Sequence, residues 1–479
     1  MNYSIIRYIL CRVLEFQGLF LLLPFLAALC YGESQGWIYL AVAAGCEIVG
    51  GLGKLIKPKS NVFYAREGFV TVSLSWILMS LTGALPFYFT GEFPTYTDAL
   101  FETISGFTTT GASILSDVEV LCHATLFWRS FTHWIGGMGV LVFILAILPL
   151  EGGYNMHLMR AESPGPAVGK LVPRVRHTAR ILYIMYILLT IVQMICLLAA
   201  GMSIFEALTL SFGTAGTGGF GILNSSIGGY SAVVQVIITV FMILFGINFN
   251  VYFLLKARKP LQALRCEEMR WYLGIIGAAV LLITINIHDS FSSVLEAFRH
   301  AAFQVASIIT TTGYSTADFN YWPEFSKFIL VILMFMGACA GSTGGGIKVS
   351  RVMVMMKLVK NELSHLIHPN RVRQIYLEKR VVTKEILRSI SVFFIAYTFV
   401  YAASVLFISL DNLDFTTNFT AVAATLNNIG PGLNQVGPAN NFSVYSQPAK
   451  YVLMFDMLAG RLELFPMLLL FAPSTWKRR

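Results

Sequence analysis

Charged residues are scarce in this sequence. Only 12% of the 479 residues are Asp, Glu, Lys or Arg, 56% are hydrophobic, and the mean hydropathy is +0.69. A soluble domain of this size needs far more charge to cover its surface, and about 25% is usual. Apolar runs of about 20 residues, long enough to cross a bilayer core, recur along the whole chain. We therefore expect an all-α integral membrane protein with many spans.

The motifs of several other protein classes are also missing. The seven cysteines show no CxxC or other paired spacing, which favours packing residues over a disulfide or metal framework. No nucleophile–base set, metal-ligand spacing or nucleotide loop is found, since Gly341–Gly346 is followed by Ile347 and Lys348 and not by Lys and then Ser or Thr. The sequence predicts no enzyme and no cofactor in this chain. The N-terminus lacks an A-x-A-like cleavage site and is expected to be a retained first span.

Positive charge is unevenly distributed. Lys and Arg are absent from three long stretches: Gly91–Leu126, Gly201–Leu255 and Asp411–Ala449. They crowd into four others: Lys54–Arg66, Arg160–Arg180, Lys256–Arg270 and Lys348–Arg388. This alternation is the positive-inside pattern, which assigns the basic connections and both termini to the cytosol. The net charge of +9 therefore needs no nucleic-acid partner, and the basic segments suit either anionic membrane lipid or an acidic regulatory subunit.

Two expected spans, Tyr3–Tyr31 and Trp37–Ile56, come first in the chain. After them one order of segments occurs four times: a full span, a short semi-apolar segment, a stretch rich in Thr, Asn or Gly, and another full span. We expect an N-terminal two-helix hairpin (1–60), four pore repeats and about ten transmembrane helices. The expected repeats are 61–150, 151–268, 269–382 and 383–479, and their second spans are Leu126–Leu150, Val233–Leu255, Phe328–Met356 and Tyr451–Phe471.

The short middle segments of these repeats resemble one another. Residues 101–111 (FETISGFTTTG) and 303–313 (FQVASIITTTG) share six of eleven positions, and Gly218 and Gly430 match Gly111 and Gly313 at a period of about 110 residues. The segments are too short to span a bilayer. Because irregular backbone at membrane depth must be buried in protein or line water, we expect re-entrant helices, each followed by an extended strand that lines one central pore.

Such a pore suits a dehydrated cation, which needs several oxygens at once without a strong countercharge. Rings of backbone carbonyls from four loops meet this need, and glycine allows successive carbonyls to face one axis. A lone Thr-Thr-Thr-Gly also serves helix packing, so the argument depends on four copies. The candidate filter residues are Thr108, Thr109, Thr110, Gly111, Ala215, Gly216, Thr217, Gly218, Thr310, Thr311, Thr312, Gly313, Asn427, Asn428, Ile429 and Gly430.

The segments SGFTTTGAS, ITTTGYS, TLNNIGPG and GSTGGGIK resemble the Trk/Ktr/HKT superfamily of potassium transporters, and in particular the TrkH-type bacterial uptake subunit. The resemblance covers essentially the whole chain. It implies a K⁺-selective pore in the bacterial inner membrane and a homodimer. It also implies a cytosolic ring of separate regulatory subunits that bind the nucleotide. Serine at the first filter position accompanies sodium permeability in relatives. Glycine at Gly111, Gly218, Gly313 and Gly430 therefore favours potassium.

The last span of the third repeat contains a glycine-rich interruption at Gly337–Lys348. Each glycine costs a helix roughly 1 kcal/mol relative to Ala, so a break is expected. The alternatives are a tight packing bend and a loop below the filter, and the resemblance makes the loop an intramembrane gate. Arg461 lies within the last span, where it is either one of an interhelical pair or, as the resemblance implies, a pore cation beside that loop. The candidate gate residues are Gly341, Ser342, Thr343, Gly344, Gly345, Gly346, Lys348 and Arg461.

The predicted function is therefore a gated K⁺ pore. The alternative is a K⁺ symporter coupled to H⁺ or Na⁺, which we disfavour because the repeats run in parallel and carry hydroxyls and amides in place of ionisable midplane groups. Glu102, Glu206 and Glu296 are expected to be external or packing groups and not filter ligands. His365 and His368, three residues apart on a basic helix, are a weak metal candidate.

Overall fold

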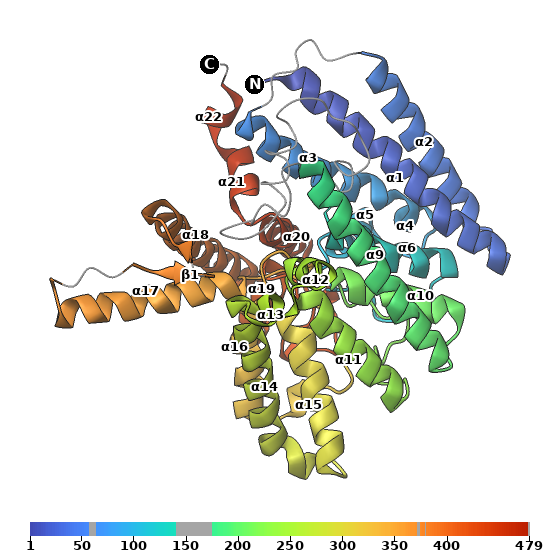
Figure 1. Cartoon of the computed structure of the whole chain (residues 1–479). Helices are drawn as coiled ribbons and strands as arrows, with labels where there is room; N and C mark the ends of the chain where they lie inside the picture. The colour runs from blue at the N-terminus through green and yellow to red at the C-terminus, as the bar shows by residue number, and fades with distance from the viewer. Residues whose placement is uncertain (57–63, 140–174, 371–373, 379, 478–479) are drawn as a thin grey trace.

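The computed structural model describes residues 1–56, 64–139, 175–370, 374–378 and 380–477 (Figure 1). These residues are almost entirely helical. The strands in the described part are the antiparallel pair β1 (Tyr376–Leu377) and β2 (Arg380–Val381). Together with the apolar helices below, this confirms the all-α membrane protein that the composition predicted.

The N-terminal hairpin consists of α1 (Tyr3–Tyr31) and α2 (Gly36–Leu55). Gly32 ends α1 in the left-handed conformation (φ 70°), and its N–H donates to the carbonyls of Ala28 and Leu29. The hairpin is joined to the next helix through Gln17, which donates to the Met79 carbonyl (2.9 Å) and accepts from the Thr82 hydroxyl (2.7 Å). The hairpin thus packs against the body through a buried polar contact as well as apolar ones.

The rest of the described chain follows one order of elements four times: a long helix, a short helix, an irregular loop and a second helix, which is interrupted in the second, third and fourth units. The first unit contains α3 (Ala65–Gly83), α4 (Leu85–Phe89), α5 (Tyr96–Phe107) and α6 (His123–Gly137). The second contains α9 (Val175–Ala199), α10 (Ile204–Gly216), α11 (Ala232–Gly246), α12 (Phe249–Lys256) and α13 (Pro260–Leu264).

The third unit contains α14 (Glu267–Ile287), η1 (His288–Ser290), α15 (Val294–Ile309), η2 (Phe319–Tyr321), α16 (Glu324–Met334) and α17 (Val349–Ile367). The fourth contains α18 (Lys384–Ile408), η3 (Ser409–Asp411), α19 (Phe415–Leu426), η4 (Asn434–Val436), η5 (Phe442–Val444), α20 (Gln447–Arg461), α21 (Phe465–Phe471) and α22 (Pro473–Trp476). In Figure 1, α17 projects from the body together with β1.

Six helices of the described residues are long and apolar enough to cross a membrane: Tyr3–Tyr31, Gly36–Leu55, Ala65–Phe89, Arg180–Ala199, Glu267–Ser290 and Lys384–Asp411. A seventh span results if α11 and α12, which meet at 89°, are counted as one. The sequence predicted continuous second spans in three units, and this is wrong in the second and fourth. The expected interruption of the third is present between Met334 and Val349, and the predicted 126–150 span extends past Gly139 into residues outside the described ones.

Local chemistry explains the two unexpected breaks. Between α11 and α12, the side chain of Asn248 accepts from the Asn250 N–H (2.9 Å) and caps a new helix start. Between α20 and α21, Glu463 and Leu464 both adopt positive φ (59° and 63°), and Pro466 then occupies the first turn of α21. Both breaks lie close to the C-terminal end of a short helix: a Cβ atom on Gly246 would lie 3.0 Å from the Thr310 side chain after α15, and one on Gly460 would lie 2.0 Å from the Leu426 oxygen at the end of α19.

The outward faces of the long helices carry large exposed apolar side chains, such as Leu26 (52%), Ile285 (61%) and Phe399 (72%). Such surfaces suit lipid contact, because a soluble protein rarely exposes them in continuous bands. The two ends of the chain lie on the same side of the molecule (Figure 1), where the Tyr3 hydroxyl donates to the Trp476 carbonyl (3.2 Å).

Candidate ion pathway

The four short helices α5, α10, α15 and α19 begin in the same way. In each, a side chain before the first turn accepts a hydrogen bond from the backbone N–H three residues later; these caps are Thr95, Ser203, Ser293 and Asp414. Capping of this kind pairs N–H groups that a helix start otherwise leaves without a partner. The four helices are therefore bounded alike, although their sequences differ.

Their C-termini are followed by four loops of matching geometry. One residue in each adopts the left-handed conformation: Thr109 (φ 54°), Thr217 (φ 55°), Thr311 (φ 57°) and Asn428 (φ 56°). The next residue of each loop donates its N–H to the carbonyl five positions earlier at 2.8 Å; these donors are Thr110, Gly218, Thr312 and Ile429. Positive φ is costly for a β-branched residue, so its occurrence at three threonines indicates a site that constrains the backbone.

A glycine with positive φ comes next in every loop: Gly111 (78°), Gly219 (81°), Gly313 (85°) and Gly430 (106°). Each glycine lies against the backbone of the neighbouring loop. A Cβ atom on Gly111 would lie 2.0 Å from the Gly218 oxygen, and one on Gly219 would lie 1.9 Å from the Thr312 oxygen. A Cβ atom on Gly313 would lie 2.1 Å from the Ile429 oxygen, and one on Gly430 would lie 2.9 Å from the Thr110 oxygen. The first loop thus contacts the second, the second the third, the third the fourth and the fourth the first, which closes a ring.

This geometry corrects the sequence register in the second unit. The sequence matched Gly218 to Gly111 and assigned Ala215–Gly218 to the filter. The left-handed residue, the 2.8 Å hydrogen bond and the ring contact all show that Gly219 is the equivalent residue. The matching window is therefore Gly216–Gly219, and Ala215 belongs to the last turn of α10.

Side-chain contacts hold these loops from behind. The hydroxyls of Thr108 and Thr110 are 2.8 Å apart in the first loop, and those of Thr310 and Thr312 are 2.7 Å apart in the third. The Asn428 amide donates to the Thr110 hydroxyl (3.0 Å), which joins the fourth loop to the first. All of these side chains are buried, and the four windows contain no charged residue.

The three glutamates near the short helices have different surroundings. The Glu102 carboxylate is fully buried behind the first loop, where it accepts from the Ser113 hydroxyl (2.9 Å), the Ile114 N–H (3.1 Å) and Arg129 Nε (2.6 Å). Glu206 and Glu296 instead accept from the backbone N–H groups of Ser203 and Ser292 near their own helix starts. Within the described residues, the hydrogen bonds of these three carboxylates go to residues outside the four windows.

Below the loops, Gly337–Lys348 forms an irregular segment between α16 and α17. Its two arms are joined because the Gly337 N–H donates to the Ile347 carbonyl (2.7 Å). It also contacts the break between α11 and α12, where the Phe249 N–H donates to the Gly341 carbonyl (3.1 Å). At its tip, the Gly345 N–H donates to the Thr311 hydroxyl (2.6 Å). The loop is thus held directly beneath the third filter window.

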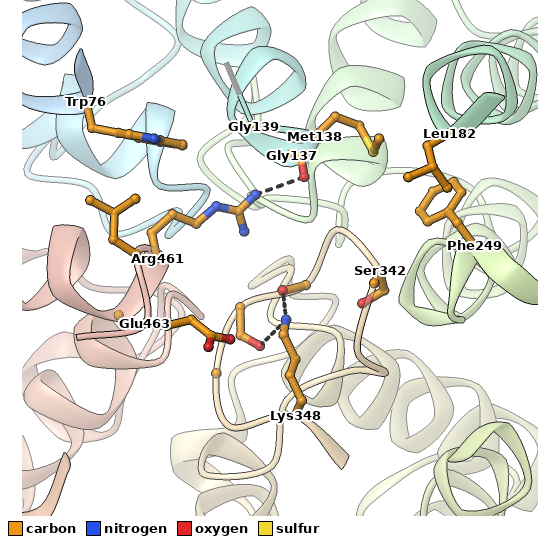
Figure 2. Close-up of a pocket in the computed structure, with 16 residues that line it drawn as sticks. Trp76, Gly137, Met138, Gly139, Leu182, Phe249, Ser342, Lys348, Arg461 and Glu463 are labelled. Carbon is orange, nitrogen blue, oxygen red and sulfur yellow. Dashed lines mark hydrogen bonds between the residues drawn. The ribbon is translucent and has the colours of Figure 1, made fainter. Parts of the chain in front are cut away.

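Arg461 ends α20 and points toward this loop (Figure 2). Its guanidinium donates to the carbonyls of Thr343 (2.9 Å), Gly136 (2.5 Å) and Gly137 (2.9 Å). These acceptors belong to the glycine-rich loop and to the end of α6. One side chain of the fourth unit therefore joins the third unit to the first, through carbonyls of an irregular loop and of a helix end.

Lys348 lies on the opposite side of the same space (Figure 2). Its ammonium donates to the carbonyls of Gly344 and Gly345 and is almost fully buried. A cavity of about 80 Å³ separates the two cationic side chains and is bordered by Trp76, Met138, Phe249 and Ser342. Such a volume has room for several water molecules. Glu463 lines it as well and forms an ion pair with Arg351.

Glu268, which the sequence did not single out, holds the loop near the start of α17. Its buried carboxylate accepts from the N–H groups of Ala340 (2.7 Å) and Ser350 (3.1 Å) and from the Asn248 amide (3.4 Å). One side chain thereby joins the loop, the start of α17 and the break between α11 and α12. Arg129 and His133 were also missed, although both are ionisable residues inside the predicted 126–150 span, which is the signal that marked Arg461.

Other candidates stay outside the pathway. His365 and His368 are exposed on α17 and its end, and the described residues contain no group of three His, Cys, Asp or Glu side chains able to hold a metal ion. All seven cysteines are free in the structure. The described geometry therefore concentrates polar groups at membrane depth in the four windows and the loop beneath them.

The chain is similar to known membrane proteins over its whole length. A family model described as a cation transport protein, TrkH, matches residues 41–478. The Trk system potassium uptake protein TrkH of Escherichia coli K12 is 39% identical over 486 residues, covering 99% of each chain. TrkG of the same organism is 34% identical over 486 residues and 100% of each chain. The crystal structure of the potassium transporter TrkH from Vibrio parahaemolyticus matches with a TM-score of 0.89 at 33% identity and covers 100% of both chains.

Proposed function

The chain belongs to the TrkH family of cation transport proteins, and from this premise we propose that it is the K⁺-conducting subunit of a Trk-type uptake system. It is a multi-pass membrane protein, and its relatives are named as potassium uptake proteins. The four units are proposed to be pore repeats, with boundaries near 61–150, 151–268, 269–382 and 383–479, around one pore. Transport, and not enzymatic chemistry, is the function of this chain.

The observation that carries the proposal is the closed contact between the four glycines and the carbonyls of neighbouring loops. We propose that the carbonyls of Thr108–Gly111, Gly216–Gly219, Thr310–Gly313 and Asn427–Gly430 replace the hydration shell of K⁺. The uncharged windows suit conduction, because a carboxylate there would trap the ion. The short helices direct their partly negative C-termini at the same region, which favours a cation.

The loop Gly341–Gly346, Lys348 and Arg461 are proposed to form the gate. In the closed arrangement the loop obstructs the pore beneath the filter, and the two cationic side chains raise the energy of a passing K⁺. The hydrogen bonds from Arg461 to Thr343 and Gly136 support a latch between the third and first units. Opening would require the loop to leave these carbonyls.

The external face supplies a negative entrance. Asp117 follows the first window, and the Asn224 side chain and the Glu119 N–H both donate to its carboxylate, which lowers the pKa of Asp117. The carboxylate therefore stays ionised near neutral pH and attracts cations. The membrane potential then suffices for uptake, since one charge gains roughly 2.3 kcal/mol per 100 mV.

A second candidate function, K⁺ symport with H⁺ or Na⁺, is favoured by one observation. Asp456 is fully buried in α20, accepts from the Ser404 hydroxyl (2.7 Å), and has a second oxygen without a partner among the described residues. Carboxyl groups at this depth often mark proton or cation relays. An Asp456→Asn variant would abolish coupling if this carboxyl carries the second ion.

The assembly is proposed to be a homodimer in the bacterial inner membrane with both termini in the cytosol. A cytosolic ring of separate nucleotide-binding subunits would regulate it, and this chain itself would hold no cofactor. Support comes from the shared side of the two termini and from the basic residues at 348–388. Those basic residues suit both anionic lipid and a regulatory partner.

Reversal potentials in liposomes test the proposal. Purified protein should give a potential that follows the K⁺ gradient and responds little to Na⁺. A potential that instead shifts with an imposed pH or Na⁺ gradient at fixed K⁺ would replace the channel by the symporter. No K⁺-dependent potential at all in folded protein would contradict both candidates.

A further inference from the structure

The four filter windows differ at the two positions whose side chains lie behind the backbone. The first and third windows have paired hydroxyls, Thr108 with Thr110 and Thr310 with Thr312. The fourth has Asn427 and Ile429. The second has Gly216 and Gly218, which offer no side chain at either position. The backbone of the second window therefore lacks the side-chain support that the other three windows have from their own residues at these two positions.

A side chain from the first unit fills this place. A Cβ atom on Gly218 would lie 2.2 Å from both Cγ and Nδ1 of His133 and 2.5 Å from its Cδ2. The imidazole of His133 in α6 thus occupies the volume that a threonine side chain on Gly218 would need. His133 is fully buried, and the described residues offer neither ring nitrogen a hydrogen-bond partner. Its contact with the window is therefore one of shape and not of hydrogen bonding.

The backbone of α6 also lies against the second window. A Cβ atom on Gly216 would lie 2.2 Å from the carbonyl oxygen of His133. The absence of a side chain on Gly216 thus permits the helix to approach, and the approach brings the imidazole to Gly218. The two glycines and the histidine form one complementary fit across two units.

The residue after the window extends this contact. The ring of Phe220 stacks on His133 with centroids 4.3 Å apart, and the Arg129 guanidinium lies 3.8 Å from the same ring. Arg129 also donates to the Gly221 carbonyl (2.9 Å). Residues one turn apart on α6 therefore hold the chain on either side of Gly219, which is the ring glycine of this window.

We propose that His133 is a positioning residue for ion selectivity, which takes the place of the missing threonine side chains behind the second window. The inference rests on the proposed K⁺ pore. The imidazole fixes the Gly218 carbonyl, which contacts Gly111 of the neighbouring loop. Without that support the carbonyl gains freedom, the ring widens on one side, and discrimination against the smaller Na⁺ falls.

The test compares permeability ratios of K⁺ to Na⁺ from reversal potentials in liposomes. His133→Ala should lower the ratio at least fivefold. His133→Leu should keep it within about twofold, because the branched leucine side chain restores atoms near the Cγ, Nδ1 and Cδ2 positions. The matched control is His300→Ala. His300 is likewise buried and stacked on a phenylalanine (Phe291, 4.9 Å), but it lies within α15, ten residues before the third window begins at Thr310, and should leave the ratio unchanged.

Substitutions at both Gly218 and His133 give a sharper test. Gly218→Thr alone should disturb the window, because its side chain collides with the imidazole. Gly218→Thr combined with His133→Ala should restore the ratio toward the wild-type value, since the threonine then occupies the vacated volume. This double variant also decides the matter if His133→Ala does not assemble.

The outcomes distinguish failure of the proposed K⁺ pore from failure of the positioning role of His133. Wild-type protein without K⁺-dependent potential overturns the proposed pore, whatever the variants do. Selective wild-type protein with an unchanged ratio in His133→Ala overturns the positioning role. A ratio in His133→Leu as low as in His133→Ala would assign the effect to the ring nitrogens and refute the steric support. Failure of the double variant to recover either assembly or selectivity would refute it as well.

Discussion

Arg461 is the side chain whose removal should change flux most. Its guanidinium donates to three carbonyls, two at the end of α6 and one in the glycine-rich loop. Arg461→Ala removes the positive charge and all three hydrogen bonds. Because the loop then loses its connection to the first unit, we expect it to leave the pore more often in the absence of any regulatory subunit.

The size of the effect follows from two contributions. A K⁺ ion passing at about 5 Å from the guanidinium meets a repulsion of about 3 kcal/mol at an effective dielectric constant of roughly 20. Hydrogen bonds from a charged donor contribute about 1.5–3 kcal/mol each, although three bonds from one group are not additive. Since about 1.4 kcal/mol corresponds to tenfold in rate, basal K⁺ flux should rise by roughly ten- to hundredfold.

The assay is K⁺ flux into liposomes at equal amounts of protein and without regulatory subunits. Arg461→Lys separates the two contributions, because it keeps the charge but cannot reproduce the planar fork that reaches three carbonyls. Its flux should lie between those of wild type and Arg461→Ala. Arg12→Ala is the matched control, since Arg12 pairs with Glu15 on α1 (2.9 Å), in the peripheral hairpin.

A deletion of the loop provides the last comparison. Removing Ala340–Gly344 should also raise flux, and its combination with Arg461→Ala should give less than the product of the two increases, since both act on one obstruction. Unchanged or lower flux in folded Arg461→Ala protein would make the arginine a structural residue and refute this gate.

Three further predictions concern the filter, the loop and the topology. Gly313→Ser should raise Na⁺ permeability relative to K⁺ in bi-ionic potentials, since a Cβ there would lie 2.1 Å from a carbonyl oxygen of the next window, and an unchanged ratio would remove Gly313 from the filter. Glu268→Ala should lower the melting temperature and raise basal flux, because the Ala340 and Ser350 N–H groups lose their acceptor at about 1–3 kcal/mol each. Glu267→Ala, which removes only a partly exposed ion pair with Lys357, should have a much smaller effect on both. In a cysteine-free background, Asp117→Cys should react with impermeant reagents from outside and Lys259→Cys only from inside; the reverse pattern would invert the topology.

Much of the fold could be predicted because membrane chemistry restricts the alternatives. Low charge, long apolar runs and the alternation of basic connections predicted a helical membrane protein, which the structure and its relatives confirm. The short helices and their loops were found because Thr-Thr-Thr-Gly recurs at 108–111 and 310–313. A backbone conformation that requires glycine can be recognised in the sequence, because the glycine recurs at the same place in each repeat.

The register of the second window could not be obtained in the same way. Gly216, Gly218 and Gly219 stand within four residues, and alignment by glycine alone cannot separate the last two. Only the backbone decides between them, because Thr217 takes the left-handed conformation and Gly219 meets the next loop. Where several residues permit a conformation, the sequence does not say which of them adopts it.

The helix breaks after Gly246 and Arg461 were also missed. Each segment is predominantly apolar, although the second also contains Asp456, Arg461 and Glu463. Each is predicted as one span, since hydropathy averages over a break of two or three residues. The signals are an asparagine, Asn248, and a proline, Pro466, and neither residue type by itself ends a membrane helix. The support that His133 gives to Gly218 depends on packing between two units, which no local pattern describes.

The four windows sit in one polypeptide, and of the four only the first and third have the same side chains throughout. In a channel of four identical subunits, every substitution is repeated around the axis, so a single substitution that affects selectivity changes all four filter windows at once. Here a substitution at Thr110, Gly218, Thr312 or Ile429 changes one filter window only. Selection can therefore adjust the ring one quarter at a time, and under the proposed role of His133 a window without side chains of its own is supported by another segment of the same chain.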